Sequence, residues 1–351
     1  MFSFNKKQHN IIYSEIKNAL QFWCVRIFGP LYNRISKSDV AFMLVEHPVI
    51  LPFLINVKLH LGITIHFVKP GSDLSNYSRV IIPNGLWPSV KNATSQIPEN
   101  KRVYCEIGFL PQTKNIYFDR LGVHGHSALR HAALLPLTVQ QKNHLEEFRL
   151  DFGKTEFVRV KWDSMDITHT KNPIKTQLFD FEFLFVPLQL ESDTAFELCE
   201  FSSNQEIILF IQKSFPNDTI VFKVHPQDKN DHYTVDPTNI LLPNTNQELR
   251  ALICQCKAVV ASNSTVILEA LLLQKKCATF GIGLTTNHQV TLECHEDLTR
   301  LPALACWEPD WDTVDRFLVL VLEKQIRVNF YESQSETKKL LKIFSDYGVM
   351  C

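Results

Sequence analysis

The sequence predicts an α/β protein built from two doubly wound domains. Short apolar runs bounded by turn residues recur along the chain, a pattern typical of buried strands in a mostly parallel sheet. Helical stretches separate many of these runs, and the pattern begins again in the second half after a polar interval. A chain of 351 residues is long enough to form two such domains.

The first series of predicted strands lies in the N-terminal part of the chain. Its four apolar runs are VAFMLVE (Val40–Glu46), GITIHFVK (Gly62–Lys69), RVIIP (Arg79–Pro83) and RVYCE (Arg102–Glu106). Two helices are predicted after them, over His126–Leu135 and Val139–Phe152. The polar, irregular stretch from Lys154 to Thr176 predicts a linker or long loop between the two series.

The second series repeats the alternation of strands and helices. Its predicted strands are Phe181–Gln189, Thr219–Pro226, a short one near Ile240–Leu242, Lys257–Ser262 and Lys276–Gly281. The predicted helices are Asn204–Ser214, Gln247–Cys256, one that begins at Ser264, and two in the tail over Trp311–Lys324 and Ser335–Tyr347. This order is typical of a doubly wound unit, whose ligands bind beyond the carboxyl ends of the strands.

These elements predict the domain organisation. Residues 1–176 form an N-terminal Rossmann-like domain, residues 177–325 a C-terminal one, and residues 326–351 a C-terminal helix that could pack back on the first domain. Two Rossmann-like domains that face each other across a cleft make a glycosyltransferase-B-like architecture, with ligands between the domains.

Composition narrows the partners and the compartment. A formal net charge of −1 gives no electrostatic reason to expect nucleic acid as a partner. Nine cysteines at irregular spacing suit a reducing compartment, so a cytoplasmic protein is expected. The opening MFSFNKKQHN is polar and predicts no signal peptide, and the apolar runs are too short to span a membrane. The amphipathic segment 11–35 either packs on its own domain or lies on a membrane surface.

Polar residues that could carry chemistry follow four of the predicted strands. They are Glu106; Gln189, Glu191 and Asp193; Lys223 and His225; and Ser262, Asn263, Ser264, Thr265 and Glu269. A structural explanation exists for several of them, since Asp193 and Ser264 could cap helices and His225 before a proline could end a strand. Glu269 lies on a mostly apolar helix face and therefore needs a partner.

Taken together, the third and fourth clusters predict a phosphate site. Lys223 and His225 lie two residues apart on one face of a strand, and a hydroxyl-rich turn begins the helix after Ser264. Metals and cofactors are not expected. The sequence Asp310-Trp311-Asp312 has the Asp-x-Asp form of metal-dependent transferases, but it opens a helix, where acidic residues are favoured.

Four motifs in this order resemble the bacterial capsule-polysaccharide synthesis family, whose members include retaining β-Kdo transferases. They are EIGFLPQ followed by IYFDRLGVHGHSAL, FVPLQLESDTAF, FKVHP and ASNSTVILEALLLQKKCATFG, and they span Glu106 to Gly281. The family commonly has Thr-Leu-Glu before Gly-Val-Asn, whereas this chain has Phe118, Asp119 and His124 there.

The resemblance implies a function and a set of site residues. It implies a metal-independent enzyme that moves β-Kdo from CMP-Kdo to a glycan or glycolipid acceptor, in the cytoplasm or at the inner face of its membrane. Residues 1–176 would be the acceptor side and 177–325 the donor side. Asp193 matches the family's nucleophile, and Glu106 is a candidate general base or sugar contact. His225 would be catalytic as well as donor-binding. The other donor-binding residues would be Gln189, Lys223, Glu269 and Ser262–Thr265.

Two alternatives keep the architecture and change the function. The chain could be a transferase for another nucleotide sugar such as CMP-sialic acid, or a sugar-nucleotide epimerase. It could also be a non-catalytic scaffold of a polysaccharide-assembly complex, although the presence of Glu106, Asp193 and His225 argues against this.

Overall fold

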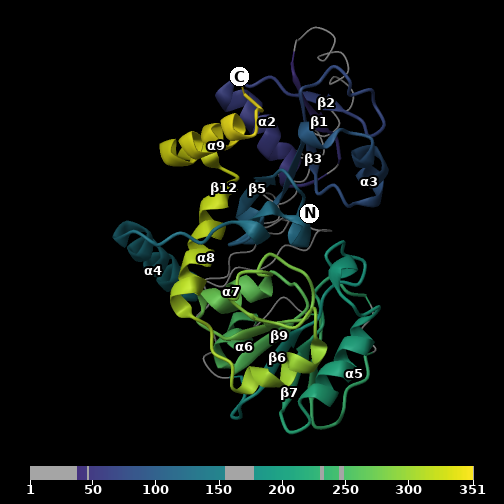
Figure 1. The fold of residues 1–351 in the computed structure, drawn as a ribbon, viewed down its shortest axis with the longest axis vertical. Coiled ribbons are helices and arrows are strands. Elements are labelled where there is room, and N and C mark those ends of the chain that lie inside the picture. The colour runs from purple at the N-terminus through teal and green to yellow at the C-terminus, as the bar shows by residue number, and fades with distance from the viewer. Residues whose placement is uncertain (1–37, 46, 155–177, 230–232, 245–248, 351) are drawn as a thin grey trace, which may run out of the picture. The chain divides into compact units, whose positions relative to one another are not determined.

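The computed structural model describes residues 38–45, 47–154, 178–229, 233–244 and 249–350. They form two compact units, one with residues 38–123 and 324–350 and one with residues 124–154 and 178–323. Each unit has a six-stranded sheet with helices packed on it (Figure 1). The predicted α/β class is therefore confirmed. The predicted segment 11–35 and most of the predicted linker lie outside the described residues.

The first unit contains a mixed sheet with a parallel centre. Its strands are β1 (Val40–Met43), β2 (His66–Val68), β3 (Arg79–Pro83), β4 (Arg102–Ile107), β5 (Asn115–Asp119) and β12 (Gln325–Arg327). They lie in the order β12-β5-β4-β3-β1-β2. The strands from β2 to β4 are parallel, whereas β5 and β12 each pair antiparallel. The run of valines, isoleucines and phenylalanines in β1, β3 and β4 is buried, as expected for central strands.

Residues from both ends of the chain build the core of the first unit. Helix α2 (Ile50–Leu61) contributes Phe53, whose ring packs on Phe118 of β5 at 6.1 Å between centroids. Phe118 in turn meets Phe344 of helix α9 (Gln334–Asp346) edge-on at 5.2 Å. Figure 1 shows α9 beside α2 in this unit. The C-terminal residues thus complete a sheet and a core that begin near residue 40.

The second unit has an entirely parallel sheet. Its strands are β6 (Leu184–Pro187), β7 (Ile220–Lys223), β8 (Ile240–Leu242), β9 (Ala258–Ala261), β10 (Cys277–Thr279) and β11 (Leu292–Glu293). They lie in the order β11-β10-β9-β6-β7-β8. This is the Rossmann strand order, in which the chain winds outward from β6 to β8 and then from β9 to β11. The switch point, where ligands bind in such sheets, therefore lies beyond the carboxyl ends of β6 and β9.

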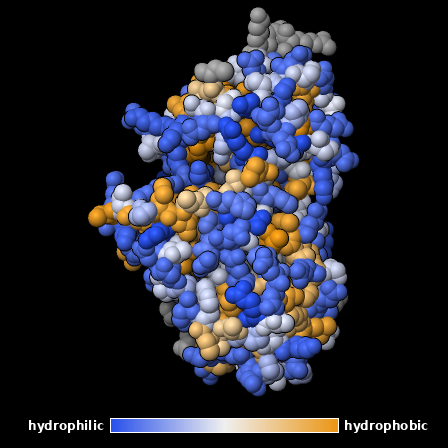
Figure 2. Space-filling view, viewed as in Figure 1, coloured by the Kyte–Doolittle hydropathy of each residue, from blue (hydrophilic) through white to orange (hydrophobic). Residues whose placement is uncertain are grey.

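The remaining helices complete the two units. Helix α3 (Pro88–Ser95) belongs to the first unit. The second contains α4 (Val139–Lys154), α5 (Asn204–Ser214), α6 (Leu249–Gln255) and α7 (Val266–Leu272), and α8 (Trp311–Lys324) runs to the boundary of the first. Helix α4 buries Leu145 and Phe152, and its Arg149 donates to the Leu272 carbonyl. The view in Figure 2 is largely hydrophilic, with orange side chains near α4, where Val139 and Leu150 are exposed.

Two predictions of local structure differ from the fold. The expected helix over His126–Leu135 is wrong, because two short 3₁₀ turns occupy 124–126 and 128–131 and the chain is extended from Ala132. Ser127 accepts a bond from the Leu129 N–H, and Pro136 disfavours helical geometry at the residue before it. The chain also passes from the first unit to the second after Val123, earlier than the predicted boundary at 176.

We expect substitution of a core residue on α9 to destabilise the first unit. Phe344 is fully buried, so Phe344→Ala removes a large side chain and should lower the free energy of unfolding by about 3–5 kcal/mol. The matched control is Lys338→Ala on the exposed face of α9, for which a change within about 0.5 kcal/mol is expected. Urea denaturation of both variants measures this difference, and equal midpoints would show that α9 is not part of this core.

Candidate functional site

The loops after three adjacent strands meet at the side chain of Asn263, at the switch point of the second unit. Its amide nitrogen donates to the carbonyls of Ala195 at 2.8 Å and Ile282 at 3.0 Å. Its amide oxygen accepts from Nε2 of Gln189 at 2.8 Å. The Gln189 amide oxygen accepts from the Asn263 backbone N–H at 3.3 Å. The loops after β6, β9 and β10 are therefore held together by one side chain.

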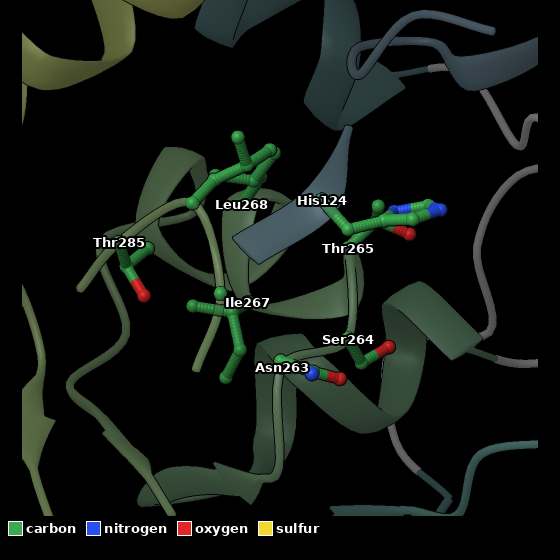
Figure 3. A pocket seen from close by; sticks show the side chains of 9 residues that line it. His124, Asn263, Ser264, Thr265, Ile267, Leu268 and Thr285 are labelled. Carbon is green, nitrogen blue, oxygen red and sulfur yellow. The ribbon is translucent and has the colours of Figure 1, made fainter. Parts of the chain in front are cut away.

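A pocket opens on this assembly. The described residues that line it are His124, Asn263, Ser264, Thr265, Ile267, Leu268, Gly283, Leu284 and Thr285. Figure 3 shows the side chains of His124, Thr265 and Ser264 projecting to one side, with Ile267 and Thr285 on the other. The pocket is thus polar along the residues just before α7 and apolar along the first turn of that helix. Hydroxyl groups and an imidazole are suited to hold an anionic or hydroxylated ligand.

The turn before α7 divides its polar residues between support and pocket. The Ser262 side chain is buried next to the thiol of Cys199, and a Cβ at Gly281 would overlap its hydroxyl. Ser264 and Thr265 line the pocket, and the Ser264 hydroxyl accepts from the Val266 N–H at 3.3 Å. Of the predicted donor-binding residues, Ser262 therefore supports the turn, and Asn263 both binds the neighbouring loops and lines the pocket. Ser264 and Thr265 line the pocket.

Asp193 lies in the loop that follows β6. Its side chain is exposed, and its Oδ1 accepts from the Ala195 N–H at 2.9 Å. The Asp193 backbone carbonyl accepts from the Phe196 N–H at 2.9 Å, which closes a turn just before the short 3₁₀ helix Phe196–Leu198. Because one oxygen positions the carboxylate and the side chain is exposed, Asp193 can meet a ligand with its other oxygen.

His124 lies near Asp193 although the two are far apart in the sequence. Burial lowers the pKa of His124 from its ordinary value of 6.5, the negative charge of Asp193 opposes this shift, and His126 adds to it. The net direction is downward, so the imidazole is neutral near pH 7. His124 also has a positive φ of 52°, which is uncommon for a residue other than glycine.

Other predicted donor residues do not gather at this pocket. Lys223 is buried at the end of β7, and its Nζ donates to the Pro243 carbonyl at 3.0 Å, toward the β8 side of the sheet. His225 is half-buried, and its Nδ1 accepts from the Gln227 N–H at 3.2 Å. Glu269 is half-buried on α7 and is not among the residues that line the pocket.

Glu106 belongs to the first unit, at the carboxyl end of β4. It is buried, with only 4% of its surface exposed. One carboxylate oxygen accepts from Nδ2 of Asn84 at 2.6 Å, and the other accepts from the Ile107 N–H at 2.8 Å. Asn84 has a φ of 56° and precedes Gly85, also left-handed. Glu106 thus supports the turn that follows β3.

Part of the pocket comes from a segment whose sequence indicates no specific ligand contact. The segment Gly281–His288 reads as a flexible loop at the cleft, and its residues Gly283, Leu284 and Thr285 line the pocket. The two glycines are its sequence signal, since a Cβ at Gly283 would lie 2.9 Å from that of Asn263. His124 and His126 read as a weak metal motif or as contacts of the sugar carboxylate. In the described part of the chain, no three His, Cys, Asp or Glu side chains are grouped to hold a metal ion.

Asp310 and Asp312 act at the start of α8, as predicted. Oδ2 of Asp310 accepts from the Thr313 hydroxyl at 2.6 Å, and Oδ1 accepts from the Asp312 N–H at 3.2 Å. Asp312 pairs with Arg316 one turn along the helix.

Among the described residues, we find no helix with the length and apolar character that a membrane span requires.

Comparison with known proteins finds a family and a fold. The model of a family described as capsule polysaccharide biosynthesis protein matches residues 149–331, just over half of the chain. Protein FixF of Sinorhizobium fredii is 30% identical over 229 residues, which are 62% of this chain and 52% of FixF. The chain therefore spans about half the length of this curated relative.

Two solved structures share the fold. The β-Kdo 2,4-transferase of Thermosulfurimonas dismutans KpsC has a TM-score of 0.56 and 14% identity, over 82% of this chain and 92% of that one. The β-Kdo 2,7-transferase of the same protein has a TM-score of 0.55 and 13% identity, over 83% and 92%. The predicted glycosyltransferase-B-like class is confirmed by these likenesses.

We expect Asn263→Ala to destabilise the second unit far more than Ser264→Ala. The first change leaves the carbonyls of Ala195 and Ile282 without their amide donor, which should cost about 2–4 kcal/mol in free energy of unfolding. Ser264→Ala removes one weak bond to Val266, which should cost about 0.5–1 kcal/mol. Chemical denaturation compares the two variants, and a similar loss in both would contradict a central role for Asn263.

Asp193→Asn should lower the pKa of His124 further. The substitution removes the negative charge that raises this pKa, while the amide oxygen can still accept from the Ala195 N–H. An NMR titration of the His124 ring protons measures the shift. The control is Glu197→Gln, a nearby exposed carboxylate that leaves the His124 titration unchanged. An unaltered His124 pKa in Asp193→Asn would mean that the two groups do not interact.

Proposed function

The chain belongs to the capsule polysaccharide biosynthesis family, and on this basis we propose that it is a retaining glycosyltransferase that moves β-Kdo from CMP-Kdo to a glycan or glycolipid acceptor. The family and the fold support a glycosyltransferase role. The observation that carries the finer proposal is the exposed carboxylate of Asp193. This residue lies in the loop after β6, which Asn263 joins to the hydroxyl-lined pocket. The reaction would take place in the cytoplasm or at the inner face of its membrane.

The donor phosphate would bind at the pocket side of the turn before α7. Ser264 and Thr265 supply hydroxyl donors there, whereas the N–H groups of Val266, Ile267 and Leu268 already donate within the turn. Helix α7 has only seven residues, so its dipole contributes less than that of a long helix. Individual hydrogen bonds from Ser264 and Thr265 therefore matter more in this proposal than the helix as a whole.

Asp193 would act as the nucleophile. Its free carboxylate oxygen attacks the anomeric carbon of Kdo and forms an ester bond, while the bond from that carbon to the phosphate oxygen breaks. CMP leaves with the electron pair of the broken bond. The donors at Ser264 and Thr265 stabilise the charge that develops on the phosphate oxygen.

The acceptor would complete the reaction with a second inversion at the same carbon. An acceptor hydroxyl attacks the glycosyl ester, gives up its proton to a general base, and releases the Asp193 carboxylate. Two inversions give net retention. Glu106 is our candidate for this base or for a sugar contact. The role of base would require it to exchange its bond from Asn84 or Ile107 for one from the acceptor.

The first test is intact-protein mass spectrometry after mixing the protein with freshly made CMP-Kdo. We expect the mass to rise by one Kdo residue, because the acceptor that would discharge the ester is absent. Asp193→Asn should give no adduct and lower turnover with acceptor by about 10³-fold or more. It should still bind CMP, since the pocket residues are unchanged.

Control variants make the outcome specific. Asp193→Asn keeps an acceptor for the Ala195 N–H, so the loop is preserved while the nucleophile is lost. Glu197→Gln alters a nearby exposed carboxylate and should form the adduct normally. An equal adduct in Asp193→Asn would overturn the nucleophile assignment. CMP binding without adduct or transfer would favour another nucleotide sugar, and absence of CMP binding would favour the scaffold.

A further inference from the structure

We propose that His124 is a specificity-determining residue that binds the carboxylate on the reacting carbon of the donor sugar. This inference rests on the proposed function, in which the donor is a 2-keto sugar acid joined to CMP. It concerns a position where the chain has histidine, whereas the resembling family commonly has asparagine.

The chemistry of the donor places the carboxylate between two groups of the site. In a 2-keto sugar acid, the anomeric carbon carries the carboxylate as well as the bond to the leaving phosphate. A nucleophile that attacks this carbon therefore approaches a negatively charged group along its path. Asp193 and the donor carboxylate repel each other at such a separation, and a hydrogen-bond donor between them reduces this repulsion.

His124 adjoins both of the positions that this geometry requires. It lines the pocket together with Ser264 and Thr265, where the phosphate is proposed to bind (Figure 3). It also interacts electrostatically with Asp193, the proposed nucleophile. Of the nine described residues that line this pocket, His124 is the one with a basic side chain. An imidazole N–H can donate to a carboxylate in either protonation state of the ring.

The backbone of the His124 turn is held in place for such a contact. A Cβ at Gly125 would lie 2.5 Å from the Ile282 carbonyl oxygen, so this turn packs directly on the loop that Asn263 also binds. Arg130 donates to the Gly125 carbonyl at 2.6 Å. The positive φ of His124 is maintained by these contacts, and strain of this kind occurs at ligand sites.

The electrostatics of His124 agree with an anionic ligand. Burial lowers its pKa, and the charge of Asp193 acts in the opposite direction. A second carboxylate bound beside the ring would act in the same direction as Asp193 and favour the imidazolium. Binding of the sugar acid would therefore strengthen the contact that holds it.

The test compares affinities for CMP and CMP-Kdo in a protein that cannot consume the donor. Asp193→Asn serves as the parent, and His124→Gly and His126→Asn are added to it separately. Asparagine at position 124 could itself donate to a carboxylate, whereas glycine has no side chain and tolerates a left-handed backbone. His124→Gly should therefore remove the donor and preserve the turn. His126 is exposed and is not among the pocket residues, which makes it the matched control. Isothermal titration calorimetry gives each dissociation constant, and circular dichroism checks folding.

We expect His124→Gly to weaken CMP-Kdo binding by about tenfold or more, the usual cost of losing a hydrogen bond to a charged group. Binding of CMP, which lacks the sugar carboxylate, should change by less than about twofold. His126→Asn removes an electrostatic effect on His124 but no pocket contact, so it should change either constant by less than about twofold. Equal CMP-Kdo affinity in His124→Gly and the parent would overturn this inference and leave the proposed function intact. Absence of binding of CMP and CMP-Kdo by the parent would overturn both.

Discussion

The geometry of the candidate site depends on the hydrogen bonds of one half-buried amide, that of Asn263. Its two N–H donors pair with carbonyls from two different loops, and its oxygen accepts from Gln189. A carboxylate of the same size has no donors, and a hydroxyl has only one, so neither could make this set of bonds. A buried carbonyl left without a donor is costly, which gives the three loops a single preferred arrangement.

The strand order explains why these loops can meet at one side chain. Strands β6 and β9 are neighbours in the sheet although they are far apart in the sequence. After β6 the chain continues toward one edge of the sheet, and after β9 it continues toward the other edge. The loops that follow these two strands therefore begin side by side. The loop after β10 then reaches the same place, with Gly281 packed on the Ser262 hydroxyl. Gly125 closes on this loop from another part of the chain. Small residues occur where two backbones approach closely, and larger ones line the open side.

Much of the fold could be predicted from the sequence because buried parallel strands are locally distinctive. Apolar runs such as Arg79–Pro83 and Ala258–Ala261 carry their signal in a few adjacent residues, and the polar residues after them follow at once. Strands β5 and β12 were not predicted, since β12 is three residues long and pairs with β5 across more than two hundred residues of chain. Pairing at such a distance leaves no mark on local periodicity.

The candidate site could be predicted in its parts but not in its assembly. Asp193, Ser264 and Thr265 follow predicted strands, and this position marks them as candidates. The proximity of His124 to Asp193 depends on packing of distant segments, so no spacing rule finds it. The direction in which the Lys223 side chain points could not be predicted from the sequence either. Alternation along a strand indicates a face, whereas the bond from Nζ to Pro243 decides where the charge lies.

The position of Lys223 changes how the proposed leaving group would be stabilised. Its ammonium bonds the Pro243 carbonyl on the β8 side, and the lowered pKa of His124 leaves that imidazole uncharged near pH 7 in the free protein. Within the described pocket, the developing charge on CMP would therefore meet neutral donors, the hydroxyls of Ser264 and Thr265. Such donors stabilise a transition state well when they are fixed in advance, because no reorganisation is needed as charge develops. The bonds of Asn263 supply that fixation, so in this proposal the amide that supports the fold also determines how well the site can stabilise the leaving phosphate.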